Sequence, residues 1–130
     1  MEIVVDTSAL MAVITDEPHR SAILNVTRGV TLRAPSSVHW EIGNAFSAMF
    51  KRGRITKAKA LKAVALYHRI PIAFVDIKLE EAIEIAARYS LYAYDTYILA
   101  CAQRFGSPLL SLDVPLMGTA KTMGLSIIDL

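Results

Sequence analysis

The sequence lacks several features that would mark a secreted or membrane protein. It has one cysteine, Cys101, which cannot form an internal disulfide and is interpreted as a small core residue of a cytosolic protein. The longest stretches without Asp, Glu, Lys or Arg are nine residues each, at 7–15 and 42–50, whereas a membrane-spanning helix needs about 18. The first residues contain no basic segment of a signal peptide. We therefore expect a cytoplasmic protein with no membrane segment.

Charged residues are also scarce, at 20% of the 130 residues, while 54% are hydrophobic and the mean hydropathy is +0.41. This composition excludes a disordered chain, which needs low hydrophobicity and high net charge. The length corresponds to about one domain, and because there is neither an internal repeat nor a linker, we expect a single domain over residues 1–130.

The net charge of +2 conceals an uneven distribution. No acid lies between residues 42 and 75, a region that holds seven of the fourteen basic residues. Its first three, Lys51, Arg52 and Arg54, lie where a predicted helix ends in a turn. They are candidates for contacts with an RNA backbone, although a solvated helix face or a surface for an acidic partner segment explains them equally well.

Short, mostly β-branched runs alternate with segments of helical periodicity. The runs predict strands at 3–5, 31–34, 72–75, 109–112 and 126–128, buried on both faces as in parallel sheets. The helical patterns cover 17–28, 37–52, 56–69, 79–89 and 96–105, with Thr56 as an N-cap and Gly106 as a C-cap. Together they predict an α/β fold with a central parallel β-sheet of about five strands, flanked by helices.

Acids lie at the positions where such a sheet binds ligands, beyond the carboxyl ends of its strands. Asp6 and Asp113 each follow a predicted strand, and Asp95 begins a helix. Each is also a good helix cap, so a structural role remains open for each one alone. Glu41 lies on the shoulder of an apolar helix stripe, where a partly buried carboxylate needs a cation or hydrogen-bond donors.

Taken together, these four acids predict a shared site at one edge of the sheet. Carboxylates that lie close together repel one another unless a cation joins them. Oxygen ligands without a Cys or His cluster favour Mg²⁺ or Mn²⁺, which activate water and neutralise the charge on a phosphate being cleaved. The pattern therefore indicates hydrolysis of phosphodiester bonds.

The motifs around these acids resemble those of the PIN-domain ribonucleases, in particular the short VapC-type toxins of prokaryotic toxin–antitoxin pairs. The matching segments are IVVDTSAL at 3–10, EIGN at 41–44, YDTYILA at 94–100 and LSLD at 110–113. The resemblance implies a PIN-like three-layer sandwich and a Mg²⁺- or Mn²⁺-dependent endoribonuclease that cleaves RNA. It also implies an antitoxin partner and a homodimer.

Carried over to this sequence, the resemblance assigns the family's acidic quartet to Asp6, Glu41, Asp95 and Asp113. Asp6 and Asp95 are expected to hold the metal, and Glu41 and Asp113 to complete its shell, orient the attacking water or support a second ion. Supporting groups are the hydroxyls of Thr7 and Ser8 and the amide of Asn44, one turn beyond Glu41.

Two alternatives remain open at this point. A phospho-accepting receiver domain would use Asp76, although Asp6 stands alone after the first strand and Lys121 lies inside a helix candidate. A PIN-like module could instead bind RNA or a partner without cleaving. The tyrosines at 89, 92, 94 and 97 either pack in the core or an interface, or stack on bases. Trp40 is expected to pack in the core or an interface.

Overall fold

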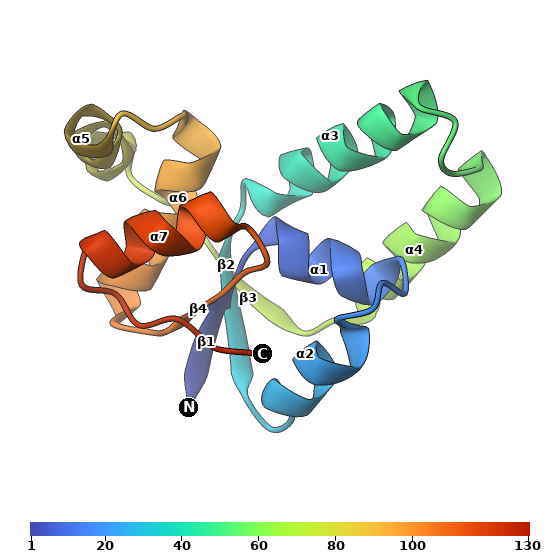
Figure 1. Cartoon of the computed structure of the whole chain (residues 1–130), viewed down its shortest axis with the longest axis horizontal. Helices are drawn as coiled ribbons and strands as arrows, with labels where there is room; N and C mark the ends of the chain where they lie inside the picture. Colours follow the sequence, from blue (N-terminus) through green and yellow to red (C-terminus); the bar gives the residue numbers. More distant parts are fainter.

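A four-stranded parallel sheet forms the centre of the computed structural model, which describes residues 1–130 (Figure 1). Its strands are β1 (Glu2–Val5), β2 (Thr31–Pro35), β3 (Ile72–Val75) and β4 (Leu109–Leu110), in the order β3-β2-β1-β4. All three neighbouring pairs are parallel. The carboxyl ends of the strands therefore lie along one edge of the sheet, as predicted for the α/β class.

Helices cover both faces of the sheet (Figure 1) and make a three-layer arrangement. The first core contains side chains of α1 (Thr7–Ile14), α2 (Arg20–Val26), α3 (Val38–Lys51) and α4 (Lys57–Arg69). The second contains side chains of α5 (Leu79–Tyr89), α6 (Ala93–Phe105) and α7 (Val114–Thr122). Successive residues of β1 alternate between them, with Ile3 and Val5 in the first core and Val4 in the second.

The sheet has one strand fewer than expected. Residues 126–128 contribute only an isolated parallel bridge, Leu109 to Ile127, although the Ile128 amide still donates to the Leu109 carbonyl at 2.8 Å. Strand β4 also ends at Leu110, because the Leu112 amide donates instead to the Ser8 side chain at 2.9 Å. The expectation of burial on both faces is wrong for β3, an edge strand whose Phe74 is 41% exposed.

The helices differ from the prediction mainly at the start of the chain. Helix α1 was not predicted, because its buried residues are nearly consecutive and show no helical period. The segment predicted as a helix over 17–28 becomes the shorter α2, since Pro18 disfavours helical geometry in the residue before it. Both predicted caps are confirmed: Thr56 accepts from the Lys59 amide, and Gly106 adopts a positive φ of 58°. None of the helices combines the length and apolarity needed to cross a bilayer.

Candidate functional site

All four predicted acids lie at the amino-terminal end of a helix. Asp6 is the N-cap residue of α1 and directly follows β1, and Asp113 is the N-cap residue of α7, three residues after the end of β4. Glu41 and Asp95 lie in the first turns of α3 and α6. Amide groups at a helix N-terminus carry partial positive charge, so each position stabilises a carboxylate locally. The fold therefore offsets part of the cost of gathering negative charge at this edge of the sheet.

Asp6 is buried, at 6% exposed, and two hydroxyl groups fix one of its oxygens. Its Oδ2 accepts from Ser8 Oγ at 2.7 Å and from Ser111 Oγ at 2.8 Å. No other side-chain hydrogen bond to Asp6 is present, so Oδ1 is available to a ligand. The carboxylate is thus held in one orientation by two neutral hydroxyl donors.

Ser111 is the functional residue that the sequence reasoning missed. Besides binding Asp6, its Oγ accepts from the Asp113 amide at 3.0 Å, while Ser8 Oγ accepts from the Leu112 amide. Each hydroxyl therefore relays a backbone N–H to the Asp6 carboxylate and ties the loop after β4 to the start of α1. The signal that could have found Ser111 is a lone hydroxyl inside an apolar strand end, Leu-Leu-Ser-Leu, beside a predicted acid.

Glu41 is partly buried, as its place on the shoulder of the apolar stripe of α3 predicts, and Thr7 Oγ1 donates a hydrogen bond to its Oε2. Burial is the largest cause that raises the pKa of Glu41; the Thr7 hydrogen bond lowers this pKa, and the negative charges of the other three acids raise it. Together these effects bring the pKa from 4.5 to about 7. The pKa of Glu41 therefore depends on the charges of all three other acids.

The pKa of Asp95 is also raised, first by burial and then by the charges of Asp113 and Asp6. No lysine or arginine is among the charges that shift the pKa of either Glu41 or Asp95. The fold thus brings the predicted quartet into one electrostatically coupled cluster without a basic side chain to neutralise it.

The donor set of this cluster fits a hard divalent cation. It consists of carboxylate oxygens with hydroxyl groups beside them, the ligand type that Mg²⁺ and Mn²⁺ prefer over sulfur and imidazole sites. As the side chains lie, no three of the acidic, imidazole or thiol groups are arranged to hold one ion. The oxygen ligands and the mutual repulsion of the acids are suited to binding a divalent cation. Direct coordination of one ion by three of the acids requires a change of side-chain positions.

The remaining predicted residues lie apart from the cluster. Asn44 is exposed and makes no side-chain hydrogen bond. Lys51, Arg52 and Arg54 are exposed where α3 turns into α4, and a rise of 1.5 Å per residue places Arg52 about 16 Å from Glu41 along the helix. The structure therefore shows no hydrogen bond between Asn44 and the acids and puts the basic turn at the far end of α3.

Asp76, the acid of the receiver-domain alternative, also lies outside the cluster. It follows the edge strand β3, which β2 separates from β1, and it accepts a hydrogen bond from Ser36 Oγ at 2.9 Å. Its charge does not contribute to the shifted pKa of Glu41 or Asp95. Trp40 is 61% exposed and Tyr92 is 90% exposed, so neither belongs to the core.

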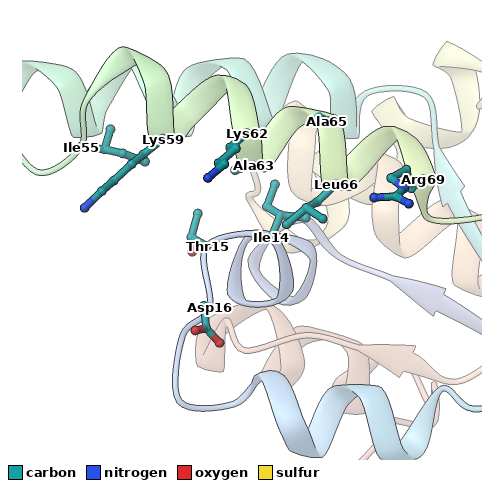
Figure 2. A pocket seen from close by; sticks show the side chains of 10 residues that line it. All are labelled: Ile14, Thr15, Asp16, Ile55, Lys59, Lys62, Ala63, Ala65, Leu66 and Arg69. Carbon is teal, nitrogen blue, oxygen red and sulfur yellow. The ribbon is translucent and has the colours of Figure 1, made fainter.

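A hollow of about 500 Å³ lies between α4 and the end of α1, away from the acids. Figure 2 shows Ile14 of α1 facing Leu66 of α4, with Lys59 and Lys62 reaching from α4 into the gap above Thr15 and Asp16. Arg69 adds a third cation at the other end of the hollow. Basic residues of the segment between 42 and 75 therefore line a groove with an apolar floor and a positively charged rim.

Comparisons with known proteins identify the family and the fold. The model of the PIN domain family matches residues 3–116, and no curated protein matches the sequence. The fold is similar to that of PAE2754 from Pyrobaculum aerophilum, with a TM-score of 0.75 and 25% identity over 98% of this chain and 83% of that one. It is also similar to a structure of VapBC2 from Rickettsia felis bound to a promoter DNA fragment, with a TM-score of 0.65 and 16% identity over 99% and 98%.

A further similar structure is that of VapC20 from Mycobacterium tuberculosis, which is described as a toxin that cleaves the sarcin–ricin loop. Its TM-score is 0.65, and the two sequences are 16% identical over 90% of this chain and 94% of that one. At this level of identity the likeness concerns the fold.

Proposed function

The chain belongs to the PIN-domain family, and on that basis we propose that it is a divalent-metal-dependent endoribonuclease, the VapC-type toxin of a toxin–antitoxin pair. The observation that carries the proposal is the coupled cluster of Asp6, Glu41, Asp95 and Asp113. Burial, together with the charges of the other three acids, raises the pKa of Glu41 to about 7, and no basic side chain is among the groups that shift it. An acid that only caps a helix or lies at the edge of an apolar stripe does not need to lie close to other acids. A cluster of this kind therefore favours cation binding over a purely structural role.

A bound Mg²⁺ or Mn²⁺ would activate a water molecule and neutralise the charge that develops on the phosphate. Asp6 and Asp95 would hold the ion. Asp6 is suited to this because Ser8 and Ser111 fix its Oδ2 and leave Oδ1 available. Glu41 and Asp113 would complete the shell, orient the water or support a second ion. Thr7 would keep Glu41 directed at the site through its hydrogen bond.

RNA is the proposed substrate, and the similar toxin VapC20, described as cleaving the sarcin–ricin loop, supports this choice. The exposed Lys51, Arg52 and Arg54 would contact the phosphate backbone at a distance from the cut. A cytoplasmic location follows from the same proposal, since an RNA substrate and a reduced, buried Cys101 both belong to that compartment.

The proposed protein partner is an antitoxin, as the similar VapBC2 structure suggests. The groove between α1 and α4 suits an amphipathic, acidic segment: Ile14 and Leu66 offer apolar contact and Lys59, Lys62 and Arg69 surround them (Figure 2). We also propose a homodimer. Leu79 and Ile83, one turn apart on α5, are 58% and 57% exposed, which is unusual for large apolar residues unless a second surface covers them.

The experiment that tests the activity is cleavage of total RNA and of short RNAs with Mg²⁺, with EDTA, and by the variants Asp6→Asn and Asp95→Asn. We expect cleavage with Mg²⁺ only, and a loss of at least 100-fold in both variants. The matched control is Asp76→Asn, which removes an acid outside the cluster and should cleave like the wild type. Cleavage that survives both EDTA and the two substitutions would overturn the metal mechanism, and no cleavage under any condition would favour a binding module.

A further inference from the structure

A second hollow, of about 320 Å³, opens beside the loop that leads from β4 into α7. Val114 and Met117 of α7 form one part of its lining, and Ile128 and Asp129 of the last segment form another. His19, just before α2, and Ser111 complete it. The hollow is therefore built from the same β4–α7 loop that carries Ser111 and Asp113.

Ser111 connects this hollow to the acidic cluster. It lines the hollow, and its Oγ donates to Asp6 Oδ2 at 2.8 Å. A group bound in the hollow consequently lies one side chain away from the carboxylate that is proposed to hold the metal. For an RNA whose phosphate is at the acids, a neighbouring nucleoside is the part of the substrate that would reach this place.

The lining suits a neutral ring rather than a charged group. No lysine or arginine contributes to it, and among its apolar residues Val114 is 72% exposed. Its two ionisable side chains, those of His19 and Asp129, are exposed and make no side-chain hydrogen bond or ion pair. An anionic ligand would be repelled by Asp129, whereas a flat ring with N–H donors would use both the apolar walls and the free carboxylate.

The hydrogen-bonding chemistry selects among the bases. The volume of about 320 Å³, room for roughly ten water molecules, is enough for a purine or a pyrimidine ring. A carboxylate accepts two parallel N–H groups. Guanine presents two adjacent donors, N1–H and N2–H, on its Watson–Crick edge, whereas adenine, cytosine and uracil each place an acceptor beside their donor.

We propose that this hollow is a base-recognition subsite that takes a guanine next to the cleaved phosphate, with the Asp129 carboxylate accepting from guanine N1–H and N2–H. His19 stacks on or packs against the ring, as aromatic residues do in the recognition of unpaired bases. The inference rests on the proposed ribonuclease function and adds a specificity-determining residue, Asp129, that lies outside the acidic quartet.

The first experiment measures binding without cleavage. The four nucleosides are titrated separately into the full chain, and the NMR signals of the Met117 and Ile128 methyl groups are followed. We expect guanosine to shift both signals and to bind about tenfold or more tightly than the other three. Asp129→Asn should remove the preference, because the amide offers a single acceptor, while Glu80→Gln, an exposed acid on α5, should retain it. Equal binding of all four nucleosides, no shift of these signals, or a preference that survives Asp129→Asn would overturn the inference.

The second experiment maps cleavage sites in a pool of short RNAs with randomised sequence. We expect guanosine at one fixed position beside the cut, and a loss of roughly tenfold to a hundredfold in that preference in Asp129→Asn, whereas Glu80→Gln should cleave with the wild-type preference and rate. Cleavage with no preference for guanosine would refute the subsite and leave the proposed function intact. If no RNA is cut, the proposed function fails, and the nucleoside titration still decides whether the hollow binds guanine.

Discussion

Removing the charge of Glu41 should stabilise the metal-free protein above neutral pH. The pKa of Glu41 is raised from 4.5 to about 7 by burial and by the neighbouring acids. A carboxyl group with a higher pKa in the folded state binds more protons when folded, so its contribution to stability is complete below pH 4.5 and is lost as the pH rises through about 7. Glu41→Gln has no such charge, and its side-chain carbonyl can still accept from Thr7.

The magnitude follows from the difference between the two pKa values. The rise from 4.5 to about 7 corresponds to about 3 kcal/mol in the free energy of unfolding. Because Glu41 is only partly buried, solvent screening reduces this to about 1–2 kcal/mol. We expect the wild type to lose this amount between pH 5 and pH 8, and Glu41→Gln to be more stable than the wild type at pH 8 by a similar amount.

The assay is urea unfolding of EDTA-treated protein at pH 5 and pH 8. All other titratable residues are the same in both proteins, so the difference between the wild type and Glu41→Gln isolates the contribution of Glu41. Glu80→Gln, on the exposed start of α5, serves as the matched control and should keep the wild-type pH dependence. Equal pH slopes in the wild type and Glu41→Gln, or a less stable Glu41→Gln at pH 8, would refute the claim that Glu41 is held among like charges.

Three further predictions concern the rest of the site and its surroundings. Ser111→Ala removes one donor to Asp6 and the acceptor for the Asp113 amide. It should lower the free energy of unfolding by about 1–2 kcal/mol and slow RNA cleavage. Unchanged cleavage would show that Ser111 does not support the site. Asp113→Ala should cost about 1 kcal/mol in thermal unfolding because the carboxylate caps α7 through the Leu116 amide. Asp113→Asn should keep the cap and lose cleavage, which equal activity would contradict. Replacing Lys51, Arg52 and Arg54 together by Gln should weaken RNA binding. The slope of the logarithm of the binding constant against the logarithm of the salt concentration should become less steep by about 2, and an unchanged slope would show that the basic turn does not contact RNA.

The sequence was sufficient for the fold class because its strongest signals are local. Strand β1 is a short β-branched run buried on both faces, and α4 begins directly after the predicted cap residue Thr56 and ends at Arg69, as its helical period predicts. The parts that were missed depend on tertiary contacts. Helix α1 is buried along most of its length and has no polar face to reveal its period, and residues 126–128 have strand-like side chains but form only one bridge.

The acids of the site were predictable because parallel sheets place their functional groups after strand ends and at helix starts. Their convergence on one site was predicted from this placement, but the size of their electrostatic coupling was not, since it depends on how α3 packs against α1 and α6 against β1. The role of Ser111 escaped prediction for the same reason: its partners Asp6 and Ser8 are more than a hundred residues away in the chain. The groove between α1 and α4 needs both helices in place, and α1 was absent from the prediction.

Calorimetric titration of Mn²⁺ into the protein at pH 7.5 tests the central claim, that the four acids form one divalent-cation site. We expect the wild type and Asp76→Asn to bind Mn²⁺ with the same affinity, and Asp6→Asn and Asp95→Asn to bind it at least tenfold more weakly. Thermal unfolding of each variant without metal verifies that it is folded. Equal Mn²⁺ affinity in all four proteins, or no binding by the wild type, would contradict the account.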